Sequence, residues 1–476
     1  MIKKSIYFDS LLLSIILLFA FIWSSLIFRQ WSTDFGNYYL MAQLSESNGL
    51  YDEIFTHKGP VFFNLIALLS IFLKWGVFQS FITYSLFNFM YLSSFYLLIK
   101  LYSDEILVRL LCVFLICSTL FLQNTNSIIS YVMMSFVLVA LIHFELFKRN
   151  QKTFNLLIAY ISLSFAFLTR VDALIFSTFI FYFIIYNSTQ RLIFLKSILI
   201  FSLIFSLIFV FFMHLNNFSL FQYFNHNILF NLAYSSMGGS DGIVSFYKPI
   251  AVYFTIVCPL VFIVSYKKNI LDLSIHYVKF DFIFLVALPL IFWLFTSSAK
   301  LSHLLILLVP TIIFFIKNFN FQEINKKILL LLLSYYFILS LLTAIPGAKS
   351  LVHFYKSDHL EMYSEEDKKI VEFLSTSSYQ NLYLIGSRAW FYIFTDMKVQ
   401  ASSNNWWFYL KPGFQTAGTL KSHSRYNESP NKTIIAIDKR IFQSELNEYF
   451  DEIIVNSSLH DFETKNFQFR VIKNNK

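Results

Sequence analysis

The sequence predicts a polytopic α-helical membrane protein that carries a small C-terminal α/β domain. Of its 476 residues, 57% are hydrophobic and only 14% are charged, and the mean hydropathy is +0.60. A soluble domain carries about a quarter charged residues, so the composition excludes an ordinary soluble protein. Many apolar runs also reach the ~20 residues that a helix needs to cross the bilayer core.

About eleven apolar runs are predicted to cross the membrane. They cover residues 9–28, 78–100, 106–123, 128–147, 153–170, 171–187, 193–214, 248–266, 281–298, 302–316 and 328–345. The first run has no small-residue cleavage site and is longer than the apolar core of a signal peptide, so we interpret it as a span.

A further apolar run, 60–75, is ambiguous, and the distribution of basic residues decides its placement. If it does not cross, the basic clusters that follow the later spans share one side with the N-terminus. These residues are Lys3, Lys4, Lys100, Lys148, Arg149, Lys152, Arg191, Lys267, Lys268, Lys317, Lys326 and Lys327. Cytoplasmic loops carry an excess of Lys and Arg. We therefore predict that 60–75 is an interfacial helix and that the N-terminus is cytoplasmic.

The same topology places the C-terminal region outside the cytoplasm. Residues 1–345 form the predicted transmembrane domain, with a first outer loop at 29–77, and residues 346–476 form the predicted soluble domain. In the latter, the β-like runs "NLYLIG", "TIIAID" and "DEIIVN" alternate with charged stretches such as "SEEDKKIVEFL". That alternation is typical of a small α/β domain.

Several common functions find no support in the sequence. The net charge of +9 is an orientation signal here and does not indicate nucleic acid as a partner. Cys112, Cys117 and Cys258 lie within apolar runs, so no disulfide or metal role is predicted for them. There is no P-loop, dinucleotide fingerprint or zinc spacing.

The polar stretch 33–60 holds the most prominent candidate residues. Asp34 follows the first span and is a candidate base, although a solvated loop carboxylate or a helix N-cap is an alternative. Tyr38 and Tyr39 follow on a helical period and are alternatively interfacial anchors. Lys58 precedes Gly-Pro and suits an anionic headgroup as a compact charge. Its alternative role is ordinary snorkelling.

Other charged side chains are predicted at the same face of the membrane. Arg170 and Asp172 occupy a tight turn between two predicted spans, where a local salt bridge is the alternative. Lys300 and His303 lie between two later spans, where His303 is alternatively a core hydrogen-bonding group. A charged side chain at the membrane costs free energy, so its presence there indicates a functional role. A base together with several cations suits sugar transfer from a lipid phosphate.

Several motifs carry a resemblance to a known superfamily. The first outer loop reads "TDFGNYYLMAQL", "NGLYDEIF" and "HKGPVFFNLIALLSIFLKWG", and later segments read "LIAYISLSFAFLTRVDALIF" and "SSAKLSHLLILLVPTIIFF". The order of these motifs along the chain, and the side of the membrane on which they are predicted to lie, resemble those of the C-type (GT-C) superfamily of integral-membrane glycosyltransferases. The closest subset is the bacterial relatives of protein O-mannosyltransferases and aminoarabinose transferases. The stretch "NLYLIGSRAWFYIFTDMKVQASSNNWW" resembles the start of the tail domain in many bacterial members.

The resemblance implies a polyprenyl-phosphate-sugar donor and transfer with inversion to a hydroxyl of a surface glycan, lipid or protein. It also implies a bacterial inner membrane, with the tail domain in the periplasm. Asp34 is then the general base and Asp52 its reserve. The donor phosphate is assigned to Lys58, Arg170, Lys300 and His303. Sugar or acceptor binding is assigned to Tyr38, Tyr39, Asn124, Asn126 and Asp172.

Two departures from the family bear on a metal cofactor. The family often has an acidic pair in the first outer loop, whereas Phe35 follows Asp34 here. A second acid is common after the third span, where this chain has "QNTNS". We therefore predict no metal site and leave a divalent metal ion as an open alternative.

Three rival functions remain open at this point. An O-antigen polymerase or ligase would use a diphosphate-linked donor and would place its working Arg and His in a large later loop. A transporter or flippase would show ionisable residues in mid-span or inverted repeats with broken helices. A non-catalytic member that only binds the lipid-linked sugar would fit the missing second acid.

Overall fold

The computed structural model describes most of the helices and the C-terminal sheet. The described residues are 2–25, 38–39, 41–43, 45, 50–51, 58–120, 128–176, 191–229, 244–266, 282–291, 304–318, 324–356, 364–385, 388, 390–395, 397–402, 430–439 and 454–473.

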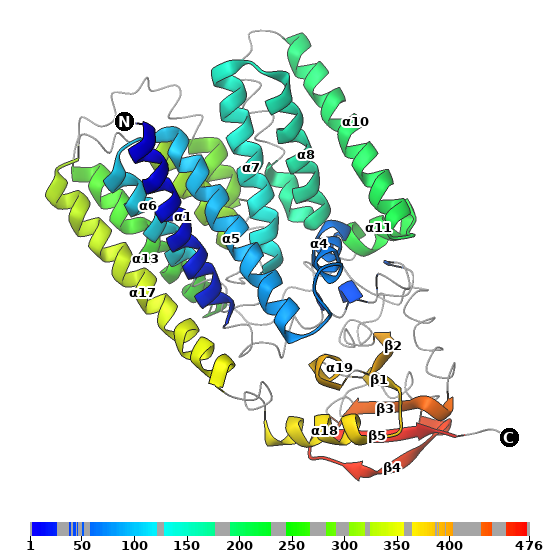
Figure 1. The fold of residues 1–476 in the computed structure, drawn as a ribbon. Coiled ribbons are helices and arrows are strands. Elements are labelled where there is room, and N and C mark those ends of the chain that lie inside the picture. Colours follow the sequence, from blue (N-terminus) through cyan, green and yellow to red (C-terminus); the bar gives the residue numbers. More distant parts are fainter. Residues whose placement is uncertain are drawn as a thin grey trace. The chain divides into compact units, whose positions relative to one another are not determined.

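Helices account for most of the described residues (Figure 1). The α-helices are α1 (Ile2–Ser24), α4 (Pro60–Ser70), α5 (Val77–Tyr102), α6 (Ile106–Thr119), α7 (Ile128–Asn150), α8 (Thr153–Thr169), α10 (Arg191–Leu215), α11 (Leu220–Tyr223), α13 (Val244–Tyr266), α16 (Leu305–Asn318), α17 (Lys326–Lys356), α18 (Glu365–Thr376) and α19 (Trp390–Thr395). Short 3-10 helices cover Val171–Phe176 (η2) and Pro430–Lys432 (η10), and π-helices cover Phe224–Leu229 (η3) and Ile283–Ala287 (η5).

Within the described residues, 5 helices are long and apolar enough to cross a membrane by length and composition. These segments are Tyr7–Ser24, Phe78–Tyr102, Ile128–Asn150, Lys196–Leu215 and Lys326–Lys349. Shorter apolar helices accompany them, so the class of multi-pass helical membrane protein is confirmed. The number of spans predicted from the sequence stays a prediction.

The ambiguous run 60–75 forms a short helix. Helix α4 has 11 residues, which at 1.5 Å per residue is roughly 16 Å. The hydrocarbon core of a bilayer is about 30 Å thick. The helix is therefore too short to cross the core, in agreement with the prediction drawn from the basic residues.

Helices lie at two other predicted boundaries. The predicted span 171–187 begins as the 3-10 helix η2. Only its residues 171–176 are described. The predicted domain boundary at 345 and 346 stays a prediction, while α17 continues through it to Lys356. Pro346 lies inside α17, and helices tolerate such a proline in apolar surroundings because neighbouring groups satisfy the freed carbonyl.

Contacts divide the chain into two compact units. The first comprises Met1–Leu26, Tyr84–Phe211 and Leu232–Lys349, and the second comprises Ile27–Thr83, Phe212–Asn231 and Ser350–Lys476. The first unit is the helical bundle. The second joins the polar segment 29–77 and the C-terminal domain to a stretch from the middle of the chain.

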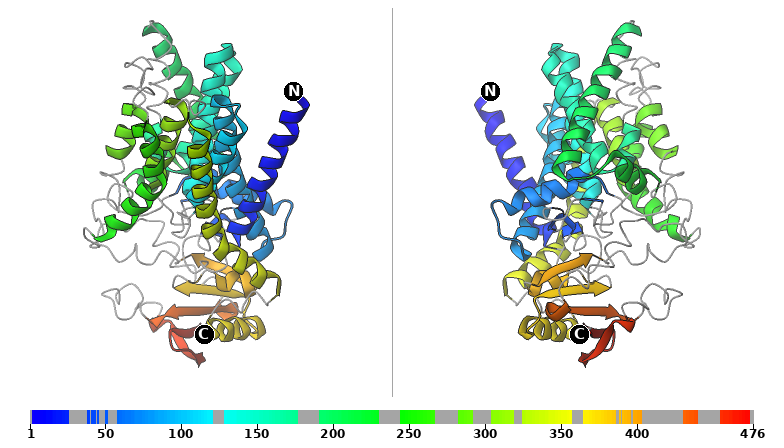
Figure 2. Two further views of the ribbon diagram at one scale, coloured as in Figure 1. Left: turned by 90° about the vertical axis from the view of Figure 1, so that its left-hand side faces the viewer. Right: turned by 90° about the vertical axis from the view of Figure 1, so that its right-hand side faces the viewer.

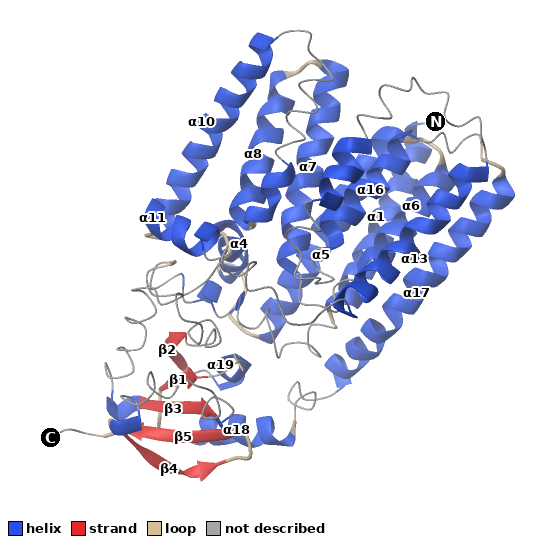
Figure 3. Cartoon of the chain, turned by 180° about the vertical axis from the view of Figure 1, so that it is seen from behind, coloured by secondary structure: helices blue, strands red, loops and turns tan. Residues whose placement is uncertain are grey.

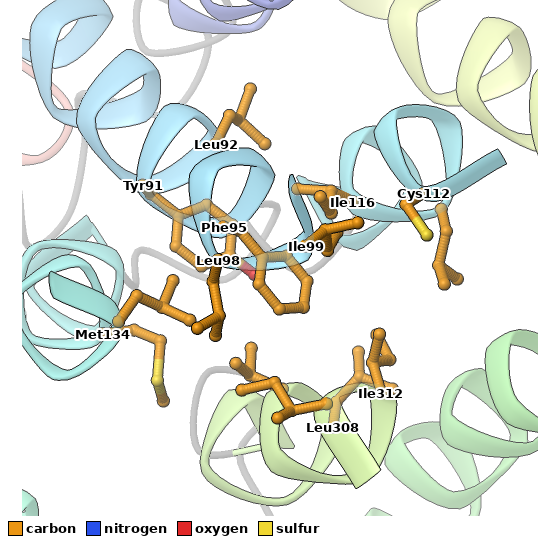
Figure 4. Packing of buried hydrophobic residues seen from close by; sticks show 14 of the residues in the cluster. Tyr91, Leu92, Phe95, Leu98, Ile99, Cys112, Ile116, Met134, Leu308 and Ile312 are labelled. Atoms are coloured by element: carbon orange, nitrogen blue, oxygen red, sulfur yellow. The ribbon is translucent and has the colours of Figure 1, made fainter. Parts of the chain in front are cut away.

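The core of the helical bundle is apolar and lies where α5, α6, α7 and α16 converge (Figure 4). Its labelled side chains are Tyr91, Leu92, Phe95, Leu98, Ile99, Cys112, Ile116, Met134, Leu308 and Ile312. Helices α7 and α8 pack along their length (Figure 3). The buried residues of α8 include Ala159, Ser162 and Ala166, and small residues let helix backbones approach closely in a membrane.

Gly347 marks another close helix approach in the bundle. A Cβ atom at this position would lie 2.4 Å from the main-chain oxygen of Ile22 in α1. The Ser25 hydroxyl donates to the Gly347 carbonyl at 2.5 Å. Only glycine allows α17 to come this near to the end of α1.

We expect Gly347→Ala to push these two helices apart and to weaken the Ser25 hydrogen bond. Overpacking of this kind costs about 1–3 kcal/mol of unfolding free energy. Unfolding of the purified protein in detergent measures the loss. Ala348→Leu, at an exposed neighbouring position, is the control and should unfold like the wild type. Equal stability of Gly347→Ala would contradict the proposed close approach.

The C-terminal domain contains one five-stranded sheet with strand order β2-β1-β3-β5-β4. The strands are β1 (Asn381–Ile385), β2 (Lys398–Ser402), β3 (Thr433–Asp438), β4 (Ser457–Glu463) and β5 (Phe467–Ile472). Strand β1 runs parallel to β2 and β3, and β5 is antiparallel to β3 and β4. The α/β character predicted for this region therefore holds for the described residues.

Helix α18 covers one side of this sheet (Figure 2). A capping box between Ser364 and Asp367 begins the helix, as the pattern Ser-x-x-acid predicts. Phe373 then stacks on Phe462 at 3.9 Å and packs edge-on against Phe469 at 5.3 Å between ring centroids. These aromatic contacts attach the helix to β4 and β5.

One predicted strand is not found in the residues that the structure describes. The run "DEIIVN" was expected to be a strand, but its described part, 454–456, is a helical turn before β4. Strand β4 instead has the sequence "SSLHDFE", and only its first residue is buried. It is an edge strand of the sheet, where exposed polar residues are normal, so hydrophobicity does not reveal it.

Candidate functional site

The polar segment 29–77 is organised around the start of α4. Gly59 is the N-cap with extended backbone angles, and Pro60 occupies the first helical turn. Proline is favoured there because its missing N–H would have no helical partner and its φ is already helical. Lys58 immediately precedes this start and is half-buried. The sequence therefore places the Lys58 side chain at a rigid helix start.

Tyr38 packs against the first turn of α4. Its ring lies 5.4 Å from that of Phe62 and 6.4 Å from that of Phe63, both in edge-on geometry. Tyr38 is 8% exposed. Edge-on aromatic pairs stabilise beyond their buried area, so this tyrosine anchors α4 to the residues after the first span.

Tyr39 joins the polar segment to the start of α5. Its hydroxyl accepts a hydrogen bond from the Gly76 main-chain N–H at 2.7 Å and also hydrogen-bonds to the Gln79 side chain. Its ring packs against Trp75 at 4.9 Å. Tyr39 was predicted from the sequence to bind the sugar or the acceptor. In the structure its hydroxyl links the polar segment to the first turn of α5.

Arg170 ends helix α8. Its main-chain N–H donates to the Ala166 carbonyl at 3.0 Å, and its Nη1 donates to the Ser130 hydroxyl of α7 at 2.6 Å. The residue is only 7% exposed. The backbone of Asp172 lies in the 3-10 helix η2, and its side chain lies outside the described part. The bond to Ser130 orients the guanidinium within the bundle.

A second polar stretch, 216–229, contacts the polar segment 29–77 within the same compact unit. The Leu50 N–H donates to the Asn216 carbonyl at 2.9 Å, and the Asn64 amide donates to the Asn216 side chain at 2.8 Å. None of the residues 216–229 is among the candidate residues predicted from the sequence. The feature of the sequence that could have indicated their role is their aromatic and Asn-rich composition, "NNFSLFQYFNHNIL".

Tyr51 is the centre of this second contact. Its ring packs against Phe218, Tyr223 and His226 at centroid distances of 5.0, 6.0 and 5.4 Å. Burial raises the pKa of the Tyr51 phenol well above its ordinary value, and the neighbouring Tyr223 adds to that shift. The phenol is therefore a neutral hydrogen-bond donor throughout the physiological pH range.

The remaining predicted site residues lie outside the described part of the chain. They are Asp34, Asp52, Asn124, Asn126, Lys300 and His303. Their assignments stay predictions. Within the described residues, no group of three or more His, Cys, Asp or Glu side chains is arranged to hold a metal ion.

A long first helix, a polar segment with a short helix, a set of apolar helices and a C-terminal sheet together make up a multi-pass membrane protein. Two solved structures share its fold. ArnT from Cupriavidus metallidurans bound to undecaprenyl phosphate has a TM-score of 0.58 and 9% identity, covering 98% of this chain and 98% of its own. The same protein in the apo state has a TM-score of 0.55 and 10% identity, covering 94% of this chain and 96% of its own.

No protein-family model matches the chain, and no curated protein matches it in sequence. The resemblance stated from the sequence motifs is therefore confirmed at the level of the fold.

Proposed function

We propose that this protein is a glycosyltransferase that moves a sugar from a polyprenyl-phosphate-linked donor to a hydroxyl acceptor. The main support for this proposal is the fold, which over 98% of this chain is shared with ArnT bound to undecaprenyl phosphate. Fold alone does not define activity. Further support comes from Lys58, a cation at the rigid start of a helix too short to cross the membrane.

In this proposal the protein lies in the bacterial inner membrane with its N-terminus in the cytoplasm. The polar segment 29–77 and the C-terminal domain then face the periplasm. The excess of basic residues after alternate spans supports this orientation. The acceptor is a hydroxyl of a surface glycan, a lipid or a protein that reaches the same face.

The proposed reaction is a direct displacement with inversion. The Asp34 carboxylate takes the proton from the acceptor hydroxyl while that oxygen forms a bond to the anomeric carbon. The bond between the anomeric carbon and the phosphate oxygen breaks, and polyprenyl phosphate leaves. Asp52 is the reserve base. No step uses a metal ion, because Phe35 stands where the family often has a second acid.

The leaving phosphate gains negative charge during this step. Preorganised cations in a partly dry site stabilise such charge better than water does. Lys58 and Arg170 are the first assignments for this role, followed by Lys300 and His303. The hydrogen bond from Arg170 to Ser130 supports the first pair, because an oriented guanidinium needs little reorganisation.

The sugar and the acceptor require further contacts. Tyr38, Asn124, Asn126 and Asp172 keep this assignment in the proposal. Tyr39 keeps it too, and its hydroxyl also bonds to Gly76 and Gln79.

We expect Lys58→Ala to weaken the binding of undecaprenyl phosphate about 10-fold to 100-fold, because a hydrogen bond to a charged group is worth roughly 1.5–3 kcal/mol. Binding of this lipid to the purified full-length protein in nanodiscs gives the dissociation constants. Lys74→Ala is the matched control, since Lys74 is an exposed lysine beyond the other end of α4. Equal losses in the two variants would show a non-specific charge effect and would refute the role of Lys58.

A non-catalytic lipid-binding protein is the second candidate, and the missing second acid favours it. The two functions differ in one measurement. A glycosyltransferase releases free undecaprenyl phosphate from an undecaprenyl-phosphate sugar when a hydroxyl acceptor is supplied, whereas a binding protein retains the donor intact. A panel of such donors, incubated with membranes that contain the wild-type chain, distinguishes them.

A further inference from the structure

Tyr51 has an unusual backbone and a fully packed side chain. Its φ is 70°, in the left-handed region that residues other than glycine seldom adopt. Its side chain is 1% exposed. A bulky residue in this conformation persists only where its surroundings hold it in place, and such residues cluster at functional sites.

The Tyr51 hydroxyl contacts the main chain of Lys58. It donates to the Lys58 carbonyl at 2.6 Å, and the side chain of Asn227 hydrogen-bonds to the same phenol. Asn227 is fully buried and belongs to the π-helix η3. Helices of this type frequently mark functional sites.

The Lys58 carbonyl precedes the N-cap Gly59, so it lies outside the hydrogen-bond ladder of α4. The bond to Tyr51 fixes the peptide plane after Lys58, and with it the direction in which the lysine side chain leaves the backbone.

The stretch 216–229 in turn holds Tyr51. Ser219 and Gln222 form a capping box that begins α11, and the rings of Phe218, Tyr223 and His226 enclose the Tyr51 ring. The Leu50 N–H bonds to Asn216. The Tyr51 side chain therefore links the stretch 216–229 to the main chain of Lys58.

We infer that Tyr51 is a positioning residue that directs Lys58 toward an anionic phosphate headgroup, and that the stretch 216–229 acts on Lys58 through it. This inference rests on the proposed binding of a polyprenyl phosphate by Lys58. It adds that a second segment, far away in sequence, controls that interaction. Tyr51 itself does not touch the reacting atoms.

The test is Tyr51→Phe, which removes the hydroxyl and keeps the ring. We expect about fivefold weaker binding of undecaprenyl phosphate, the worth of a typical hydrogen bond. We also expect the double variant Tyr51→Phe/Lys58→Ala to bind as Lys58→Ala does, because the hydroxyl acts only through the lysine. Asn227→Ala should give a smaller loss that is likewise absent without Lys58.

Tyr336→Phe is the matched control. Tyr336 is another fully buried tyrosine whose hydroxyl donates to a main-chain carbonyl, that of Ile256 at 2.5 Å. It should lose stability without losing affinity for the lipid.

The outcomes separate this inference from the proposed function. Additive losses in the double variant, with a wild-type chain that binds the lipid, would overturn the inference alone. A wild-type chain that binds no undecaprenyl phosphate would overturn both. Should Tyr51→Phe fail to fold, the pair Asn227→Ala and Asn227→Ala/Lys58→Ala gives the same comparison, and additive losses there would also overturn the inference.

Discussion

Asp34→Asn should lower sugar transfer about 100-fold to 10,000-fold, the contribution typical of a general base, and should leave the affinity for undecaprenyl phosphate unchanged. The amide has nearly the shape of the carboxylate but cannot accept the proton of the acceptor hydroxyl. Transfer in membranes that contain equal amounts of wild-type and variant protein measures the rate, and binding of undecaprenyl phosphate measures the affinity.

Asp52→Asn is the comparison for this experiment, because Asp52 lies in the same polar segment and is the reserve base. We expect a much smaller loss from it. A reversed order would assign the base to Asp52. Transfer near the wild-type rate in both variants would remove general-base catalysis by this segment from the proposed mechanism.

The second large effect is expected in the helical bundle, where Asp9 of α1 lies in a charged cluster. Its carboxylate accepts hydrogen bonds from the Tyr96 hydroxyl and from Arg109 Nη1, the latter at 3.0 Å, and it pairs with Lys100. The Arg109 side chain is 4% exposed and that of Asp9 is 12% exposed. Three helices, α1, α5 and α6, meet at this single carboxylate.

Asp9→Ala should therefore cost about 3–5 kcal/mol of unfolding free energy, the cost of breaking a buried ion pair by removing one partner. The buried Arg109 guanidinium would lose its partner on α1, because Nη1 reaches Asp9 while Nη2 reaches Asp104. Unfolding of the protein in mixed detergent micelles measures the loss.

Asp104→Ala is the matched control for this experiment, since Asp104 pairs with the same arginine but its side chain is 97% exposed. We expect a far smaller loss, because exposed ion pairs contribute little. Similar losses in the two variants would indicate that the cluster is not held by the buried carboxylate.

Asp9 also illustrates what sequence reading misses. In the sequence, Asp9 is the first residue of the first predicted span. Its partners Tyr96, Lys100 and Arg109 are 87 to 100 residues away. Nothing local in the sequence indicates that these groups meet.

The candidate site shows the same division. The position of Lys58 before a short helix followed from Gly59 and Pro60 and from the distribution of basic residues. The hydrogen bonds of Tyr39 to Gly76 and Gln79, by contrast, could not be predicted. Helical spacing places a residue on a face but does not identify its partner.

By itself, the sequence determined the class of membrane protein, a short helix within 60–75, the candidate residues and the α/β nature of the tail. These properties depend on consecutive residues, because the free energy of membrane insertion sums along a run and the basic residues between runs set its orientation. Only the tertiary structure decided which polar groups meet: Tyr51 with Lys58 and with the stretch 216–229, Arg170 with Ser130, and Asp9 with Arg109. Hydrogen bonds form over about 3 Å, and the fold alone brings residues so distant in the chain to that separation.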